Sequence, residues 1–246
     1  MCYTAIFESL WIQTELYQKL KESEEVKDDF VHIAAHELRT PIQPILGLTQ
    51  LLRSQVNNVK QQEILDITIR NAKRLQRLTN DILDVTKIEA RKLELYEENF
   101  NLNDVVINAM NDITLGTDSL KNENIRLSYN PQDILIHADK GRISQVISNL
   151  LTNAMKFTTQ GTIFVGVEKN KNNNSVIVWV KDSGQGIDVN MLPRLFTKFA
   201  SKSYKGTGIG LFISKGIIEA HGGKIWAGNN EDGIGAIFHF SLPLRR

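Results

Sequence analysis

One histidine lies among residues that could take part in nucleophilic chemistry. His36 stands in the string VHIAAHELRTP, with Glu37 beside it and Thr40 four residues later. At about 100° per residue, His36 points away from the apolar stripe of its predicted helix, and Thr40 stacks over the same exposed face. An imidazole is a competent nucleophile toward phosphorus when a carboxylate accepts its second ring proton, and Glu37 is placed to do so. The spacing therefore favours a phosphate-accepting histidine, and an ordinary exposed histidine is the alternative.

A predicted helix near residue 150 carries side chains that suit a magnesium–polyphosphate complex. Asn149 and Asn153 are four residues apart, and Lys156 and Phe157 follow on the next turn, so one face presents all four. Amide oxygens are suitable ligands for Mg²⁺, and a lysine ammonium suits phosphate. Two asparagines on an ordinary surface helix are the alternative interpretation.

Two glycine-containing segments further along could bring backbone close to a ligand. Asp182, Gly184 and Gly186 follow a predicted strand in the sequence DSGQG, where an acidic side chain meets flexible backbone. The segment GTGIGL (206–211) leads into a helix, whose N-terminal N–H groups could face phosphates. It is not a Walker loop, because no Gly-Lys-Ser/Thr follows. Each segment taken alone is also consistent with an ordinary turn.

Two long helices must position His36. Apolar residues recur at three- and four-residue spacing over about 38–52, and after the break at SQVNNVK the same spacing continues over 61–95. These patterns predict a helical hairpin. Because one hairpin hides only one side of each helix, we predict a homodimer in which two hairpins form a four-helix bundle. The predicted dimer stripe includes Leu65, Ile69, Ala72 and Leu83. The predicted seam within the hairpin comprises Leu38, Ile42, Ile45, Thr49, Leu52, Ile64, Thr68, Asn71, Leu75, Leu78, Ile82, Val85 and Glu89.

The segment before and around His36 carries two further signals. Residues 8–30 contain no Gly or Pro, so they predict a helix, and the polar middle of their heptad seam favours a linker helix over a coiled coil. Pro41 and Pro44 remove two backbone N–H groups, which predicts a kink after His36. The alternative is that Pro41 simply ends a short helix.

The rest of the chain predicts an α+β layer. Helices are expected over about 103–120, 140–157 and 208–221, and short strands over 125–129 and 134–138. The runs TIFVGVEK (161–168) and SVIVWVKD (175–182) flank turn-forming asparagines and predict adjacent antiparallel strands. KIWAG and GAIFHFSL predict a final strand pair, which completes a domain of about 150 residues.

Composition excludes several classes of protein. The 246 residues contain 29 Lys and Arg against 28 Asp and Glu, so no charge excess favours nucleic-acid or bilayer-surface binding. The single Cys2 cannot form an internal disulfide and is compatible with a reducing compartment, so the cytoplasm is the expected location. No stretch approaches the roughly 18 consecutive apolar residues of a membrane span, so no membrane segment is expected.

The string FVHIAAHELRTPIQPILG closely resembles the phosphoacceptor box of sensor histidine kinases, above all in its H-E-L-R-T-P core. In that family the histidine is phosphorylated, the next acidic residue acts as base, and the threonine helps to position water when the enzyme acts as a phosphatase. The resemblance implies these roles for His36, Glu37 and Thr40. Pro41 matches the family's proline, whereas Pro44 is less usual there.

The order and spacing of four later segments resemble the N, G1, F and G2 boxes of the GHKL ATP-binding domain, which histidine kinases share with gyrase-type topoisomerases, mismatch-repair ATPases and ninety-kilodalton heat-shock chaperones. The resemblance implies that N-box residues serve Mg²⁺ and phosphates, that the G1 aspartate accepts a hydrogen bond from the adenine amino group, and that the G2 glycines close a lid. The lid would span about 188–205, where Phe196 and Phe199 could anchor it. The implied ligands are ATP and Mg²⁺, with Asn149 and Asn153 as metal ligands. The implied nucleotide-binding residues are Asn149, Asn153, Lys156, Phe157, Asp182, Gly184, Gly186, Gly206, Thr207, Gly208, Gly210 and Leu211.

One position separates a kinase from the hydrolysing relatives. Those relatives carry a glutamate one helical turn before the N-box asparagine, where it acts as base toward water. Asn149 occupies that position here and cannot take a proton, so another nucleophile must attack the γ-phosphate, and His36 with Glu37 is the candidate. A catalytically silent signalling scaffold and a GHKL-type ATPase clamp are the alternatives, and a predominantly phosphatase role stays open.

The resemblance also implies a domain plan and partners. We expect a linker or signalling helix over 1–25, a dimerisation and phosphotransfer domain over 26–96 and an α/β sandwich of the GHKL type over 97–246, with a hinge near 96–99. The phosphoryl group would pass from His36 to an aspartate of a response-regulator receiver domain, and an upstream sensor domain would supply the signal.

Overall fold

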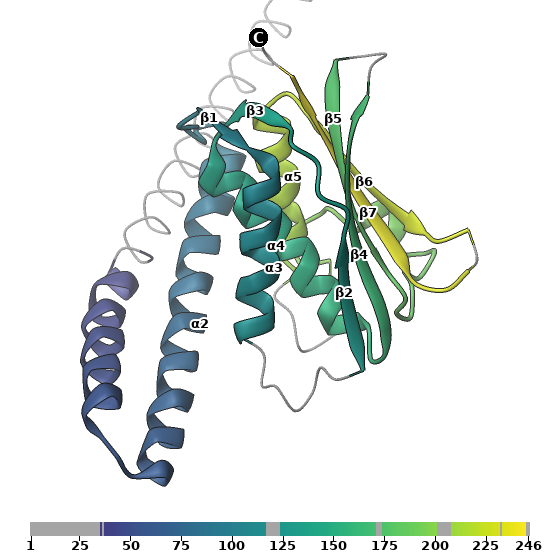
Figure 1. The fold of residues 1–246 in the computed structure, drawn as a ribbon. Helices are drawn as coiled ribbons and strands as arrows, with labels where there is room; N and C mark the ends of the chain where they lie inside the picture. The colour runs from purple at the N-terminus through teal and green to yellow at the C-terminus, as the bar shows by residue number, and fades with distance from the viewer. Residues whose placement is uncertain are drawn as a thin grey trace, which may run out of the picture. The chain divides into compact units, whose positions relative to one another are not determined.

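The computed structural model of the protein describes residues 35, 37–116, 124–170, 174–200, 208–231 and 233–244. The chain divides into two compact units, Met1–Ala90 and Arg91–Arg246 (Figure 1). The helix predicted over 8–30 lies outside the described residues, and so does His36.

The first unit contains a helical hairpin. Its first helix covers residues 37–55, and its second helix, α2, is Val59–Glu89. The connection at 56–58 is short, and Asn58 caps α2 by accepting a hydrogen bond from the backbone N–H of Gln61. Two helices joined by so short a loop must run antiparallel, as Figure 1 shows. The predicted hairpin is therefore present.

Side-chain bonds fix the register of the two hairpin helices. Nε and Nη2 of Arg39 both donate to Oδ1 of Asn80, at 3.2 and 2.6 Å. Nε of Arg53 lies 2.8 Å from Oδ1 of Asp66. Arg53 follows Arg39 by 14 residues on the first helix, and Asp66 precedes Asn80 by 14 residues on α2. The two antiparallel helices therefore keep one register between these two bonds.

The first hairpin helix is uninterrupted, and the second is shorter than predicted. Residues 37–55 are helical without a break, so Pro41 does not end a short helix. The second helix was expected to reach residue 95 but ends at Glu89, with Ala90 as its C-cap. Arg91 then adopts a left-handed backbone conformation with φ 54°, which stops helical propagation. The sequence has no glycine at this position that would have predicted the end of the helix.

The buried stripe of the hairpin differs from the predicted one. Ile42 is 2% exposed and Thr49 is also buried, but Ile45 of the same predicted seam is 50% exposed. On α2, Ala72 and Leu83 are buried although they were assigned to the dimer stripe. The spacing of apolar residues on each helix alone does not decide which residues face the other helix, because that depends on the register between the two helices. The other large seam residues left exposed are Leu38, Leu52, Ile64, Leu75 and Ile82.

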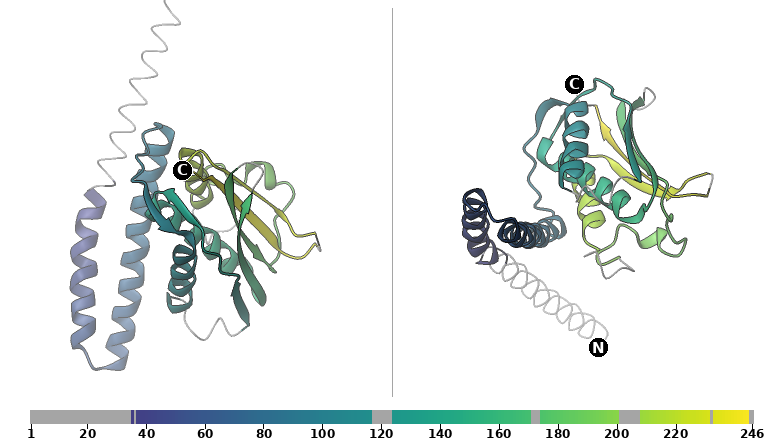
Figure 2. Two further views of the ribbon diagram at one scale, coloured as in Figure 1. Left: turned by 45° about the horizontal axis from the view of Figure 1, so that its top comes forward. Right: turned by 60° about the horizontal axis from the view of Figure 1, so that its bottom comes forward.

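The second unit is a layer of helices on one face of a β-sheet (Figures 1 and 2). Its helices are α3 (Leu102–Gly116), α4 (Lys140–Phe157) and α5 (Gly210–Ala220). The five-stranded sheet has the order β2-β4-β5-β7-β6, formed by Ile125–Tyr129, Gly161–Asn170, Ser175–Asp182, Ala236–Pro243 and Lys224–Asn229. Only β2 and β4 pair in parallel in this sheet, and the other neighbours are antiparallel.

The core of the second unit lies between α4 and the sheet. Six residues at three- and four-residue spacing on α4 are buried, whereas alternate residues of the central strands face the helices. Burial of each large aliphatic side chain contributes about 1.5–3 kcal/mol to stability. The buried α4 residues are Ile143, Val146, Ile147, Leu150, Leu151 and Ala154.

Most predicted elements of this unit are confirmed, including the antiparallel pairs β4–β5 and β6–β7. The strand β1 (Glu98–Asn101) was missed, and it pairs with β3 (Leu135–Ala138) in a separate two-stranded sheet. The backbone N–H of Tyr96 donates to Oδ2 of Asp139. The hinge expected near 96–99 therefore falls on residues already bound into the second unit.

A buried histidine holds the start of α4 in place. Asp139 caps α4 by accepting from the backbone N–H of Arg142, and its own N–H donates to Nε2 of His221 at 3.0 Å. Nδ1 of His221 lies 2.8 Å from the carbonyl of Ile217, so this ring carries its proton on Nδ1 and is neutral. Tyr96, the start of α4 and the end of α5 are thereby joined through two side chains.

The outer face of the sheet depends on one glycine. Gly166 of β4 lies opposite Trp179 of β5, and a Cβ at Gly166 would overlap the indole ring. We predict that Gly166→Ala displaces Trp179 and lowers the free energy of unfolding by about 1–2 kcal/mol. Denaturant titration followed by tryptophan fluorescence measures this effect. Gly228→Ala is the matched control in β6, because a Cβ at Gly228 would have no atom within 4 Å, and an equal loss there would contradict the argument.

Candidate functional site

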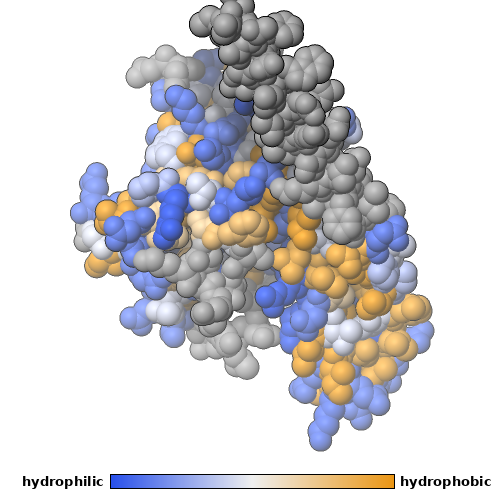
Figure 3. All heavy atoms as spheres, turned by 180° about the vertical axis from the view of Figure 1, so that it is seen from behind, coloured by the Kyte–Doolittle hydropathy of each residue, from blue (hydrophilic) through white to orange (hydrophobic). Residues whose placement is uncertain are grey.

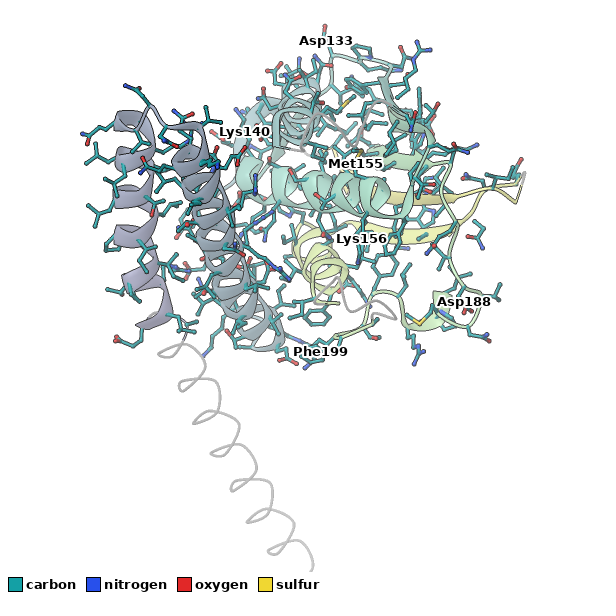
Figure 4. All side chains as sticks on the ribbon, turned by 90° about the horizontal axis from the view of Figure 1, so that it is seen from below. Asp133, Lys140, Met155, Lys156, Asp188 and Phe199 are labelled. Carbon is teal, nitrogen blue, oxygen red and sulfur yellow. The ribbon has the colours of Figure 1, made fainter. Side chains whose placement is uncertain are left out.

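The side chains singled out on α4 lie along the edge of its buried face. Asn149 and Asn153 are half-buried, and Nδ2 of Asn149 donates to Oγ of Ser214 on α5 at 2.8 Å. This bond holds the amide of Asn149 in one orientation. Lys156 and Phe157 occupy the last turn of the helix, where the Lys156 ammonium lies 4.6 Å from the centre of the Phe157 ring. Figure 4 shows Lys156 at this end of α4, on the side of α5 and of the segment from Asp188 to Phe199.

Asp182 is a buried carboxylate at the end of the central strand β5. It is 4% exposed, and its Oδ1 accepts from the backbone N–H of Gly184 at 2.9 Å and of Ala236 at 3.2 Å. Burial raises the pKa of Asp182, and the two backbone N–H groups partly oppose that shift. Both of the hydrogen bonds described for this carboxylate involve Oδ1. A ligand with a hydrogen-bond donor can therefore be recognised through Oδ2.

The end of α4 and the turn after β5 are in direct contact. The backbone N–H of Gln185 donates to the carbonyl of Phe157, and a Cβ at Gly184 would overlap that same carbonyl oxygen. Glycine is therefore required at position 184 for close approach of two backbones. Gly186 has φ 74°, a left-handed conformation that also favours glycine. The structure thus brings the first and second of the predicted segments together.

The start of α5 lies against the middle of α4. A Cβ at Gly210, the first residue of α5, would overlap Oδ1 of Asn149, so glycine allows the helix to begin here. Gly208 has φ 69°, and a Cβ there would lie within 3 Å of the Phe199 backbone. Leu211 is half-buried on the first turn of α5. Of the fourth segment, Gly206 and Thr207 lie outside the described residues.

In the described part of the expected lid, Phe196 is half-buried, and two residues that were not predicted as anchors are buried. Met191 and Leu195 flank a short 3-10 helix at Leu192–Arg194 and are buried. Phe199 is 70% exposed and has a left-handed backbone with φ 59°, so it does not anchor this segment as expected. The prediction is therefore wrong for Phe199, and it missed Met191 and Leu195.

Sequence reasoning missed the residues that hold Asp182 from the other side. They lie at the end of β6 and the start of β7, in the sequence NNEDGIGA. Nδ2 of Asn230 donates to the backbone carbonyl of Asp182 at 2.8 Å, and Ala236 supplies one of the N–H groups on Oδ1. The composition of this stretch predicts a turn, but nothing in it signals contact with a strand about 50 residues earlier.

The phosphoacceptor segment is described in part. Glu37 and Thr40 are exposed on the first hairpin helix, whereas His36 lies outside the described residues. Arg39 of the same motif is held by Asn80 of α2. Among the described residues no cluster of three His, Cys, Asp or Glu side chains could hold a metal ion.

Two family models match the two units. The model described as "His Kinase A (phospho-acceptor) domain" matches residues 26–91, and that described as "Histidine kinase-, DNA gyrase B-, and HSP90-like ATPase" matches residues 138–246. The solved catalytic domain of the histidine kinase ThkA is 33% identical, covering 61% of this chain and 98% of that chain, with a TM-score of 0.53. This chain belongs to the histidine kinase family.

Further comparisons agree with this assignment. The structure of full-length ShkA in complex with AMPPNP has 26% identity and a TM-score of 0.70, covering 87% of this chain and 45% of that chain. The autoinducer 2 sensor kinase/phosphatase LuxQ of Vibrio vulnificus is 31% identical over 240 residues, which are 93% of this chain and 28% of LuxQ. The predicted combination of a helical hairpin and a GHKL-type ATP-binding domain is confirmed.

This histidine kinase chain spans little more than a quarter of the length of the first curated relatives it matches. In the part of the chain that the structure describes, none of the helices has the length and apolar composition needed to cross a membrane.

The raised pKa of Asp182 predicts how the stability of the protein without nucleotide depends on pH. Because the pKa of Asp182 is raised, folding favours its protonated form, so its contribution to stability is greatest at low pH and is lost as pH rises through the raised pKa. We predict that Asp182→Asn melts at or above the wild-type temperature at pH 7.5, and that its advantage shrinks as pH falls. Thermal denaturation of both proteins from pH 5 to 8 measures this. An advantage that grows toward low pH would show that the sign is wrong.

Proposed function

We propose that this chain is a histidine kinase core that uses ATP to phosphorylate His36 and passes the phosphoryl group to an aspartate of a response-regulator receiver domain. The observation that supports this most is the convergence of α4, the turn after β5 and the start of α5 around Asp182 and Asn149. The proposal is carried by that site together with the phosphoacceptor motif in the same chain.

The nucleotide would bind in the second unit. Oδ2 of Asp182 would accept a hydrogen bond from the adenine amino group, since Oδ1 is already bonded to two backbone N–H groups. The backbone N–H groups at the start of α5 would face the phosphates, where the helix dipole favours negative charge. Lys156 would add a positive charge near the phosphates, and Phe157 would lie near the base or ribose. Gly206, Thr207, Gly208 and Leu211 would complete the phosphate-binding segment.

The residues present fit a magnesium ion that arrives with the nucleotide. Asn149 and Asn153 offer neutral amide oxygens, which are hard ligands of the kind Mg²⁺ accepts beside phosphate oxygens and water. When bound, Mg²⁺ neutralises charge on the phosphate oxygens. Ser214 keeps the Asn149 amide nitrogen occupied, so its oxygen is the atom available to the ion.

The chemical step would take place on the first unit. A ring nitrogen of His36 attacks the γ-phosphorus, the bond between phosphorus and the β–γ bridging oxygen breaks, and ADP leaves. Glu37 accepts the proton from the other ring nitrogen, which keeps the imidazole nucleophilic. Asn149 cannot activate water, because an amide does not take a proton at neutral pH, and this disfavours an ATPase clamp.

Phosphatase activity is a second candidate function. Thr40 is exposed one helical turn beyond position 36, and with Glu37 it could position water against a phosphorylated receiver domain. The printed name of LuxQ includes both kinase and phosphatase. A silent scaffold is the least supported alternative, because the sequence retains Asn149, Asn153 and Asp182, the residues proposed to bind the nucleotide and its metal ion.

The domain plan and surroundings follow the same proposal. Residues 1–25 would form a signalling helix, 26–90 the dimerisation and phosphotransfer domain, and 91–246 the ATP-binding domain, with the boundary moved from 96 to the division between the two units. An upstream sensor domain would supply the signal, and the chain would act in the cytoplasm, without binding nucleic acid.

A homodimer is supported by the apolar surface of the hairpin. Leu38, Ile45 and Leu52 recur every seven residues on the first helix and are about half exposed. Given the register of the hairpin, Ile82 and Leu75 of α2 lie level with the first two of them. Figure 3 shows apolar side chains spread over the hairpin at its lower right. A self-complementary pairing of two hairpins would bury this stripe in a four-helix bundle.

Autophosphorylation tests the kinase proposal. The purified chain, incubated with γ-labelled ATP and Mg²⁺, should acquire acid-labile, alkali-stable label, and His36→Gln should abolish it. Asp182→Asn should lower labelling on the order of a hundredfold at limiting ATP, because a charge-assisted hydrogen bond is replaced by two facing donors. His137→Gln, at an exposed histidine of β3, is the matched control and should label normally.

Label that persists in His36→Gln would contradict the assignment of the nucleophile. Steady multiple-turnover hydrolysis by that variant would favour the ATPase clamp instead.

The oligomeric state tests the proposed dimer. Ile45→Glu places a charge on the exposed stripe of both subunits, so we expect the dimer dissociation constant to rise on the order of a hundredfold or more. Sedimentation equilibrium measures the change. Gln50→Glu, an exposed position on the same helix, should leave the dimer unchanged, and equal effects of both variants would contradict this interface.

A further inference from the structure

The connection from β6 to β7 holds the backbone of Asp182. Asn230 is 7% exposed, and its Nδ2 donates to the carbonyls of Asp182 and Ile234. Both partners are acceptors, so the orientation of the Asn230 amide is determined: its nitrogen, and not its oxygen, must face them. A side chain without two amide hydrogens cannot make this pair of bonds.

The neighbouring asparagine holds the other end of the same segment. Oδ1 of Asn229 accepts from the backbone N–H of Ile187 at 2.7 Å, and its Nδ2 donates to the carbonyl of Ile187 at 2.9 Å. One side chain therefore satisfies both backbone groups of Ile187, as a paired strand residue would. Asn230 and Asn229 therefore form hydrogen bonds to the backbone of the first and last residues of segment 182–187.

The approach of the two segments leaves little space between them. Gly235 has φ 82°, and a Cβ there would overlap the carbonyl oxygen of Asp182. A Cβ at Gly186 would lie 3.0 Å from Oδ1 of Asn229. The next residue, Ala236, donates its N–H to Oδ1 of the Asp182 carboxylate. The side chain and the main chain of Asp182 are thus both set by the β6–β7 connection.

We propose that Asn229 and Asn230 are positioning residues for adenine recognition, because they hold residues 182–187 in the shape that aims the Asp182 carboxylate at the base. The inference rests on the proposed role of Asp182 in binding ATP. Without Asn230 the buried carbonyl of Asp182 loses its donor, and the strand end can shift to find another. The two bonds to Oδ1 would then lengthen or turn, and Oδ2 would no longer meet the adenine amino group.

The test compares two nucleotides that differ at the group Asp182 would recognise. ATP carries a 6-amino donor, whereas inosine triphosphate carries a 6-oxo group and has the same sugar and phosphates. Binding of each to the whole chain, with Mg²⁺ present, is measured by calorimetry for the wild type, Asn230→Ala, Asn229→Ala and Asp182→Asn. Asn108→Ala, at an exposed position of α3, is the matched control.

We expect Asn230→Ala to raise the dissociation constant of ATP on the order of tenfold, and Asn229→Ala about threefold, as loss of one or two net hydrogen bonds would. Neither should change the affinity for inosine triphosphate by more than about twofold. A role limited to general folding would weaken both nucleotides alike, so the ratio of the two constants is the decisive quantity.

The outcomes separate this inference from the proposed function. If the wild type prefers ATP and Asp182→Asn removes that preference, but both alanine variants keep it, the positioning role is overturned and the proposed function stands. If the wild type does not prefer ATP, or if Asp182→Asn keeps the preference, the proposed role of Asp182 in adenine recognition fails and the inference fails with it. If Asn230→Ala does not fold, Asn229→Ala decides the question, because its bonds to Ile187 lie at the surface.

Discussion

The Asp182 carboxylate lies where the end of β5, the turn that follows it and the start of β7 meet. Its two bonds to backbone N–H groups join these three segments. Gly184 belongs to the turn that contacts the end of α4, and Ala236 begins β7. Because a buried charge is costly unless it is hydrogen-bonded, the fold must keep both donors in place. The antiparallel pairing of β5 with β7 does this, since it brings Ala236 to the end of β5. This arrangement requires glycine at positions such as 184 and 235, where two backbones approach closely.

The hairpin is organised by a different constraint, the distance at which two helices can pack. Small or short residues such as Thr49 and Ala72 are buried, whereas Ile45 and Leu75, level with each other, remain exposed. Ile42 and Leu83 are also buried in the packed stripe, and the remaining large side chains lie on the adjoining surface. A two-helix unit therefore leaves apolar side chains on its surface.

The sequence was sufficient where a local pattern carries the information. Helical spacing predicted α4, alternation predicted the β4–β5 pair, and the motif around position 36 indicated the family. It was insufficient where two distant segments decide the outcome. The choice between Ile42 and Ile45 as a seam residue depends on the register with α2, and the role of Asn230 depends on a strand end about 50 residues away. Nothing local distinguishes such residues from ordinary surface or turn positions. The strand β1 was missed for the same reason, because its partner β3 is separated from it in the sequence by α3 and β2.

The bond from the Tyr96 backbone to Asp139 sets the length of the tether between the units. With Tyr96 fixed at its far end and α2 ending at Glu89, the connector consists of residues 90–95. Six residues span at most about 20 Å when fully extended. Arg39 of the phosphoacceptor motif is bonded to Asn80, which lies roughly 14 Å before the end of α2 at the helical rise of 1.5 Å per residue. The connector therefore limits the separation of Glu89 and Tyr96, and lengthening it would lower the effective concentration of one unit at the other.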